Sequence, residues 1–567
     1  MDIQRIIIWA GLAVVSYLMV LAWNEDYHVN RPVQDQQVTQ AIPEQSSEIG
    51  SPVGDEFSAP DADTAVTQNG QSGTDEATQG QVVSGGGKIE VVTDLLAVDI
   101  SQLGGHLVSA RLLEYDQTLN GDDPLPLLRN DNRMTYVLES SLVGPDGPDG
   151  RGDGGPARYR SAASRYQLDD GQDQLVVDLE LENDTGAAIT KRYIFSRNSY
   201  QIEVRYLVDN TSESVWRGNF SGKIVRDQSP DPTAQDSFGI QSFLGLVLNT
   251  PEDPYEKYDF SDLQDKSLNL TVNGGWIAFL QHYFLTAWVP GLDQTHRYQT
   301  TRRGDLQVMG FVSPTTQVQP GERGELGAKL YIGPKIIDRL ENVAPNMDRT
   351  VDFGWLFFIS YPLFLILEWF YGIVGNWGVA IILLTVVVKL AFFKLSATSY
   401  RSMANMRRVT PQIQRLREQY GDDRQKMSQE MMALYKKEKI NPLGGCLPIL
   451  VQMPVFIALY WCLFESVQLR HAPFMLWIQD LSVMDPYFVL PILMGASMFL
   501  QMSLNPTPPD PIQARVMKLM PLIFTVFFLW FPAGLVLYWL VNNILSIAQQ
   551  WVITHQIENG PKKPAKT

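Results

Sequence analysis

Cysteine and histidine are scarce in this chain of 567 residues, which has two cysteines and six histidines. Cys446 and Cys462 fall in one apolar stretch, where a helix would hold them about 24 Å apart, too far for a disulfide bond. There is no CxxC, no zinc-ligand spacing, and no GxSxG, HExxH or phosphate-binding glycine loop. We therefore predict no metal, no cofactor and no catalytic residues, and we expect that the protein is not an enzyme.

Basic residues are also few, with 45 Lys and Arg against 62 Asp and Glu and a formal net charge of −17. Such a balance argues against DNA as a partner, because phosphate binding needs concentrated positive charge. The sign reverses locally, since residues 397–441 hold ten basic and five acidic residues. Residues 24–87 hold eleven acidic residues and one basic residue, and they are too polar to form a core. We expect a disordered acidic tether there.

Long apolar runs stand at both ends of the chain. Residues 1–23 contain the run Ile6–Trp23, which as a helix would span about 27 Å, close to the thickness of the bilayer core. We interpret it as an uncleaved anchor, the alternative being a cleaved signal peptide. Six further apolar stretches occupy residues 354–374, 377–396, 443–465, 487–503, 517–532 and 533–553.

Between the tether and these stretches, residues 88–343 alternate apolar and polar side chains, as at Leu175, Val177 and Leu179. This period of two, with glycine- and asparagine-rich turns, predicts a large antiparallel β-sandwich, closed by a short helix from Pro334 to about Val343. The apolar segment 274–290 could be a membrane span, but strands flank it and Gln281 interrupts it. We expect buried strands there.

The charges between the apolar stretches predict the topology. Basic loops stay in the cytoplasm, which places the loop 397–441 and the tail 554–567 inside, and the weakly charged loop 467–486 outside. A cytoplasmic N-terminus satisfies this pattern only if one stretch does not cross. The aromatic-rich stretch 354–374 suits an interfacial helix, although an N-terminus outside would also resolve the parity. We predict six spans, with both termini cytoplasmic and the β-domain periplasmic.

Lys389 lies deep in the second of these spans, roughly 18 Å from its start. A charge inside a membrane is costly and commonly marks a functional cavity, although a lysine can also extend its ammonium to the headgroups. Other polar side chains in the spans could line a groove with Lys389, or could simply join helices by hydrogen bonds. The predicted groove residues are Lys389, Thr385, Gln452, Tyr538, Trp539, Asn542 and Asn543.

The basic loop 397–441 should form a hairpin of two amphipathic helices, about 400–419 and 423–438, with Asp422 as the cap of the second. Its positive charge suits ribosomal RNA or anionic lipid. Its methionines suit varied partners, or they pack the hairpin together. The predicted partner-facing residues are Arg407, Arg408, Arg415, Arg417, Met427, Met431, Lys436 and Lys437.

Three runs identify a family. The runs Asn441–Tyr460 (NPLGGCLPILVQMPVFIALY) and Ile523–Tyr538 (IFTVFFLWFPAGLVLY), with Gly375–Gly378 (GNWG), resemble the YidC/Oxa/Alb family of membrane insertases. The resemblance extends over the whole chain. It implies a monomer that takes nascent membrane proteins from ribosomes, alone or with the Sec translocon. It also implies a β-supersandwich, an interfacial helix at 354–374, and a hydrophilic groove with a positive residue in the second span.

One position departs from that family, because its better-known members have arginine where this chain has Lys389. Arginine keeps its charge in proteins, whereas a desolvated lysine can lose it. Two other functions compete with insertion. A secondary transporter should show internal repeats, which we do not find in the sequence. A membrane-anchored sugar-processing enzyme would need paired carboxylates in a cleft of the β-domain, which the sequence does not exclude.

Overall fold

The computed structural model describes residues 87–150, 156–182, 186–234, 242–420, 423–438, 447–505 and 511–559. The predicted anchor at 6–23 and nearly all of the tether at 24–87 lie outside these ranges. The described residues form two compact units. The β unit lies within Gly54–Asp352 and includes Glu465–Ala472, and the helical unit contains Phe353–Phe464 and the residues from Pro473 onward.

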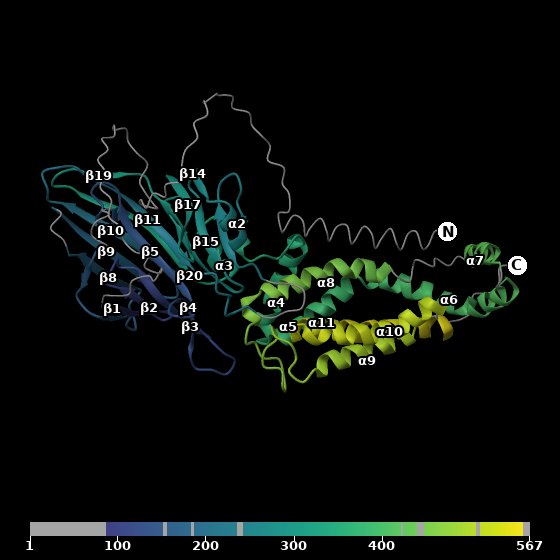
Figure 1. Cartoon of the computed structure of the whole chain (residues 1–567). Coiled ribbons are helices and arrows are strands. Elements are labelled where there is room, and N and C mark those ends of the chain that lie inside the picture. Colours follow the sequence, from purple (N-terminus) through teal and green to yellow (C-terminus); the bar gives the residue numbers. More distant parts are fainter. Residues whose placement is uncertain are drawn as a thin grey trace, which may run out of the picture. The chain divides into compact units, whose positions relative to one another are not determined.

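The first sheet of the β unit has eleven strands in the order β14-β17-β18-β11-β5-β4-β3-β2-β1-β7, with β19 paired to β11 (Figure 1). Its pairs are antiparallel except that of β1 with β7. The strands are β1 (Lys88–Val92), β2 (Leu96–Ser101), β3 (Leu107–Asp116), β4 (Pro124–Asn130), β5 (Thr135–Val143), β7 (Arg165–Gln167), β11 (Trp216–Arg226), β14 (Asn269–Asn273), β17 (Thr295–Arg303), β18 (Leu306–Val312) and β19 (Thr316–Val318).

The second sheet has nine antiparallel strands in the order β13-β12-β15-β16-β20-β10-β9-β8-β6. They are β6 (Tyr159–Ser161), β8 (Gln174–Leu181), β9 (Ala187–Ser196), β10 (Gln201–Asn210), β12 (Gly245–Asn249), β13 (Glu256–Tyr258), β15 (Trp276–Leu280), β16 (Phe284–Val289) and β20 (Arg323–Pro334). Short helices are η1 (Pro148–Gly150), α2 (Phe260–Asp265), α3 (Ile337–Glu341) and η2 (Met347–Thr350).

The two sheets pack face to face, which confirms the predicted β-sandwich. Tyr136 of the first sheet shares a hydrogen bond of 2.7 Å with Thr286 of the second, and the rings of Phe220 and Trp288 meet at 5.9 Å. Strand β8 buries Val177 and Leu179 on one face, as the alternation predicts. The apolar segment 274–290 forms the buried strands β15 and β16, as we expected.

The predicted closing helix is wrong in its start. Pro334 is the last residue of β20, where it pairs with Phe284 of β16, and α3 begins only at Ile337. A proline at the end of a strand loses no ladder bond that the sheet needs, so the strand can continue through it. The helix signal came from a residue type that suits both positions.

Lys191 is a fully buried charge in the core of the sandwich. Its ammonium donates hydrogen bonds to the carbonyls of Gly104 at 3.1 Å and Ser140 at 2.9 Å, and it lies 5.2 Å from the ring of Tyr206. Gly105 stands beside it with φ +59°, and a Cβ there would approach the Lys191 side chain to 3.0 Å. Glycine is therefore needed at this position both for its backbone and for the lysine.

The helices of the helical unit are α4 (Phe357–Val374), α5 (Trp377–Ala391), α6 (Phe393–Tyr420), α7 (Arg424–Lys437), α8 (Leu447–Glu465), α9 (Val489–Ser503), α10 (Pro511–Phe527), η5 (Phe528–Trp530) and α11 (Ala533–Asn559). The short η4 (Val467–Leu469), after α8, belongs to the β unit. Within the described residues, α4 is the one continuous helix long and apolar enough to cross a bilayer, and α5 with part of α6 passes as a pair bent by 67°. The count of six spans stays a prediction, as does the interfacial position of α4.

Several boundaries in this unit differ from the predicted ones. The apolar stretch 377–396 is not one straight helix, because α5 ends at Ala391 and α6 leaves in a new direction from Phe393. Hydropathy does not reveal a change in the direction of a helix, and the phenylalanines at the bend leave the stretch continuously apolar. The helix that covers the predicted stretch 517–532 begins at Pro511, because polar residues such as Arg515 end an apolar window but not a helix.

The end of that helix and the cap of α7 also differ from the sequence-based expectation. The helix gives way to η5 and then to extended backbone at Phe531, because the following Pro532 disfavours helical geometry there. The cap of α7 is Asp423, not Asp422, and its carboxylate accepts the backbone N–H of Lys426 at 3.0 Å. Two adjacent aspartates cannot be told apart by residue type alone.

Candidate functional site

A polar stripe runs along one face of α11. Tyr538, Asn542 and Ser546 follow one another at intervals of four residues, so they lie on one side of the helix, about 6 Å apart along its axis. Tyr538 and Ser546 are buried, at 1% and 3% exposure, and Asn542 is partly buried. Because these side chains are buried or partly buried, each polar group needs a partner inside the unit.

Lys389 of α5 finds its partner on this stripe. Its ammonium donates a hydrogen bond of 2.7 Å to the Ser546 hydroxyl, which in turn donates to the carbonyl of Asn542 at 2.7 Å. Among the described residues, no carboxylate forms an ion pair with Lys389. The positive charge is therefore held by a neutral hydroxyl between two apolar helices and has no counter-ion in the described part of the unit.

Gln452 of α8 meets the other end of the stripe. Its side-chain amide donates to the Tyr538 hydroxyl at 2.7 Å, so two of the predicted groove residues are direct partners. Asn543 bonds on another side, donating to Ser497 of α9 at 3.1 Å. The Thr385 hydroxyl donates to the carbonyl of Ile381 in its own helix at 2.7 Å, so it joins none of these contacts.

Trp539 belongs to an aromatic cluster and not to the polar stripe. Its ring meets that of Phe456 edge to face at 4.5 Å and that of Phe528 at 5.4 Å. Within the described residues its indole N–H is buried without a hydrogen-bond partner, as is the side-chain carbonyl of Asn542. These two groups are polar atoms available to a ligand that reaches them.

The hairpin residues divide into packed and exposed ones. Met431 packs with Met406 against a cluster of Val409, Ile413 and Tyr435, which holds α6 and α7 together. Met427 is partly buried, whereas Arg408, Arg415, Lys436 and Lys437 are exposed. The side chains of Arg407 and Arg417 lie outside the described part of the hairpin. The packing interpretation therefore holds for Met431, and the basic residues are free to face a partner.

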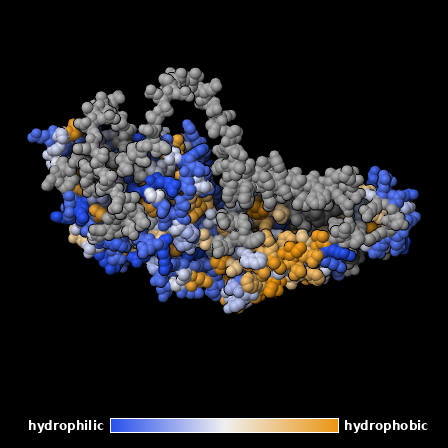
Figure 2. All heavy atoms as spheres, in the orientation of Figure 1, coloured by the Kyte–Doolittle hydropathy of each residue, from blue (hydrophilic) through white to orange (hydrophobic). Residues whose placement is uncertain are grey.

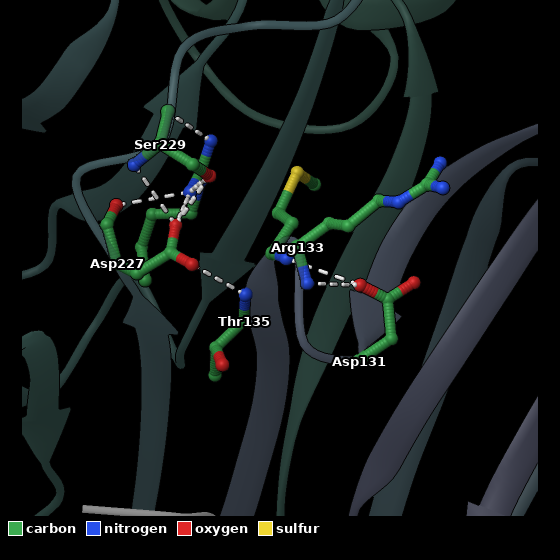
Figure 3. Close-up of polar contacts among 7 residues, drawn as sticks. Asp131, Arg133, Thr135, Asp227 and Ser229 are labelled. Atoms are coloured by element: carbon green, nitrogen blue, oxygen red, sulfur yellow. Dashed lines mark hydrogen bonds and ion pairs between the residues drawn. The ribbon is translucent and has the colours of Figure 1, made fainter.

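The β unit has a cavity of about 670 Å³ that the sequence did not indicate. Its charged lining residues are Lys88, Arg111, Arg129, Arg133, Asp99 and Asp131. Figure 3 shows the turn at its rim, where the Asp131 carboxylate accepts the N–H of Arg133 at 2.8 Å, and nearby Asp227 accepts the N–H of Thr135 at 2.6 Å. The N–H of Arg133 lowers the pKa of Asp131. Four basic and two acidic residues suit an anion better than a cation.

Comparison with known proteins agrees with both units. The family described as YidC periplasmic domain matches residues 88–366, and that described as 60Kd inner membrane protein matches residues 369–560. The membrane protein insertase YidC of Marinobacter nauticus is 65% identical, over 98% of this chain and 99% of the relative. The chain belongs to the YidC family of membrane protein insertases.

Other YidC proteins match over similar lengths. That of Hahella chejuensis is 57% identical, over 99% of this chain and 98% of its own. A crystal structure titled as an active YidC insertase with its first transmembrane domain resolved aligns with 82% of this chain and 93% of its own, at 17% identity and a TM-score of 0.38. The YidC relatives are named insertases and not enzymes, and they are inner-membrane proteins with a periplasmic domain.

Sequence reasoning missed one residue of this candidate site. Ser546 is a common residue near the end of the last apolar stretch, and nothing in its immediate neighbours marks it. A signal was present, however, because Ser546 lies four residues after Asn542, as Asn542 lies four after Tyr538. Extending the helical period through Asn542 would have placed it on the same face.

Proposed function

We propose that this chain integrates nascent proteins into the bacterial inner membrane through polar side chains that α5, α8 and α11 bring together. The observation that carries the proposal concerns the Lys389 ammonium. It donates a hydrogen bond of 2.7 Å to Ser546, and no carboxylate among the described residues forms an ion pair with it. Lys389 is partly buried, and a cation placed between apolar helices is expensive, so its retention favours a function.

The unpaired charge defines what the site could attract. An acidic residue of a translocating segment would give Lys389 the counter-ion that the described part of the unit lacks, and the attraction is strong where water is sparse. The Gln452–Tyr538 pair and the side-chain carbonyl of Asn542 could accept or donate bonds to a polar backbone. The apolar faces of the helices then pass hydrophobic segments to lipid. This process requires no covalent step and no cofactor.

The finer arrangement belongs to the same proposal. It has six spans, with both termini and the 397–441 hairpin in the cytoplasm, the β unit in the periplasm, and a groove open to the cytoplasm and to lipid. The exposed Arg408, Arg415, Lys436 and Lys437 support a hairpin that faces the ribosome, because they present positive charge to RNA. The protein would act as a monomer, alone or with the Sec translocon.

The test compares Lys389→Ala with Lys389→Arg in an insertion assay on vesicles, using substrates with and without acidic residues in the translocated segment. We expect the alanine variant to lose insertion of the acidic substrate at least several-fold and the arginine variant to retain it. Lys394→Ala is the matched control, since Lys394 is exposed at the start of α6. Full activity of Lys389→Ala on the acidic substrate would remove the charge from the mechanism.

Crosslinking gives an independent check on position. A photoreactive residue placed at 452 should crosslink to a stalled nascent chain, and one placed at the exposed Leu292 of the β unit should not. If both positions label equally, the substrate does not pass along α8 and α11, and the site lies elsewhere.

A further inference from the structure

The loop at residues 473–488, which precedes α9, has a surface without charge. Its two charged residues, Asp480 and Asp485, are buried, at 6% and 1% exposure. Apart from Gln479, whose amide donates to the carbonyl of Leu476 at 2.9 Å, the large side chains that it exposes are apolar or aromatic. They are Met475 (51%), Leu476 (75%), Val483 (36%), Met484 (49%), Tyr487 (67%) and Phe488 (38%). A loop facing water would ordinarily expose polar residues, so this surface requires a partner.

The backbone of the 473–488 loop is also unusual. Leu476 and Phe488 both have φ of 56°, in the left-handed region. Large side chains disfavour that region, because their Cβ crowds the following carbonyl. Elsewhere in the described chain, the non-glycine residues with positive φ are three asparagines and one histidine, which tolerate it better. Strained leucine and phenylalanine in an exposed loop suggest a role for the apolar side chains themselves.

The loop is held firmly by the ends of three helices. The side-chain amide of Asn376, at the start of α5, donates to the carbonyl of Phe474 at 2.9 Å. The N–H groups of Ala533 and Gly534, at the start of α11, donate to the carbonyls of Val483 at 2.7 Å and Leu481 at 2.9 Å. These bonds satisfy backbone groups of the loop inside the unit, so its exposed side chains are presented on a fixed frame.

Asp485 provides the third attachment. Its carboxylate accepts the N–H of Leu490 in α9 at 2.7 Å, the N–H of Tyr487 at 3.0 Å, and the indole N–H of Trp477 at 2.9 Å. The carboxylate is therefore satisfied by donors of the loop and of α9, and it presents no charge to solvent. Burying the charge while exposing Leu476 and Tyr487 is the arrangement that an apolar medium favours.

We propose that the 473–488 loop lies in the interfacial layer of the bilayer, with Leu476 and Tyr487 in contact with lipid. The partner is lipid because the loop is continuous with α9. Phe488 leads directly into this helix, whose exposed residues include Ile492, Leu493 and Phe499. Figure 2 shows a broad apolar area on the surface over α9 and the adjacent part of α10. Lipid that covers α9 reaches the loop, where a tyrosine among apolar residues fits the aromatic belt of membrane proteins. The proposal rests on the membrane location of the helical unit, not on insertion activity.

Spin labels test the position in the full-length protein, alone in vesicles of phosphatidylethanolamine and phosphatidylglycerol. Single cysteines replace Leu476, Leu493 of α9 as the lipid reference, and Leu292 of the β unit as the water reference, in a background with Cys446→Ser and Cys462→Ala. The measured quantity is the ratio of the collision rate of the label with oxygen to its collision rate with a water-soluble nickel chelate. We expect this ratio at 476 to be several-fold above that at 292 and close to that at 493. A ratio equal to that at 292 overturns the proposal, and so does shielding from both reagents, which would indicate a protein contact.

A second variant separates the apolar contact from the shape of the loop. Leu476→Asn keeps a residue that tolerates positive φ but removes the apolar group, while Leu476→Met keeps both size and hydrophobicity. With the label at 487, the oxygen-to-chelate ratio should fall several-fold in the asparagine variant and stay unchanged in the methionine variant. An unchanged ratio in both variants would show that the side chain of Leu476 does not hold the loop in lipid.

Discussion

Lys389 and Ser546 lie 157 positions apart in the sequence, and a hydrogen bond of 2.7 Å joins the ammonium of one to the hydroxyl of the other. The bond fixes the lysine against α11 instead of leaving it to extend toward the headgroups. That distinction matters, because a charge fixed between helices can meet a passing substrate, whereas a charge at the headgroups cannot. Snorkelling and a functional site were both open from the sequence, and this contact favours the site.

Ser546→Ala should weaken insertion of substrates with acidic residues several-fold, less than Lys389→Ala does. The ammonium remains but loses its fixed position, and a hydrogen bond to a charged group is worth about 1.5–3 kcal/mol. The measurement is insertion yield in vesicles. Ser503→Ala is the control, because Ser503 is exposed on α9 and donates to its own helix. Equal losses in the two serine variants would deny Ser546 a specific part.

The Gln452–Tyr538 pair should show a measurable coupling energy. Tyr538→Phe leaves the amide of Gln452 without its acceptor, and Gln452→Leu leaves the hydroxyl of Tyr538 without its donor. We expect the double variant to be more stable than the sum of the single losses predicts, by about 0.5–2 kcal/mol. Denaturation of the detergent-solubilised protein measures the cycle. Strict additivity would contradict a direct bond between the two side chains.

Lys191 should make the β unit more stable as pH rises above neutrality. Burial lowers the pKa of Lys191 from 10.5 to about 7 in the folded chain. Between those values the unfolded chain binds the extra proton, so the free energy of unfolding rises with pH, and below about pH 7 the penalty is complete and constant. Between pH 7 and 10, the unfolding temperature should therefore rise less steeply with pH in Lys191→Met than in the unchanged protein. Lys329→Met, at an exposed position of β20, should keep the steeper rise.

Adjacent methionines of α7 separate the two interpretations of the hairpin. Met431 packs against the cluster of Val409 and Ile413, whereas Met432 is 56% exposed. Met431→Gln should lower the stability of the hairpin by about 1–3 kcal/mol, seen as faster amide exchange in α6 and α7. Met432→Gln should leave exchange unchanged and reduce binding to ribosomes or substrate only if exposed methionine serves a partner. Faster exchange in Met432→Gln would assign both residues to packing.

The sequence by itself determined the elements that depend on near neighbours. Alternation at Val177 and Leu179 predicted strands of the sandwich, the apolar stretches predicted most of the helices, and three motif runs were sufficient to identify the family. Each of these signals lies within a few residues along the chain, where spacing fixes which side chains share a face. The same local signals did not fix the exact ends of the elements, as the start of α3 and the cap of α7 show.

Only the tertiary structure decided which side chains meet. That Lys389 bonds to Ser546, that Gln452 bonds to Tyr538 and that Thr385 bonds only to its own helix depend on the rotation and register of packed helices. These are set by the packing of whole surfaces, which no short window of sequence contains. The left-handed backbone at Leu476 has the same origin, because its loop is attached to α5 and α11, which lie far from it in the chain.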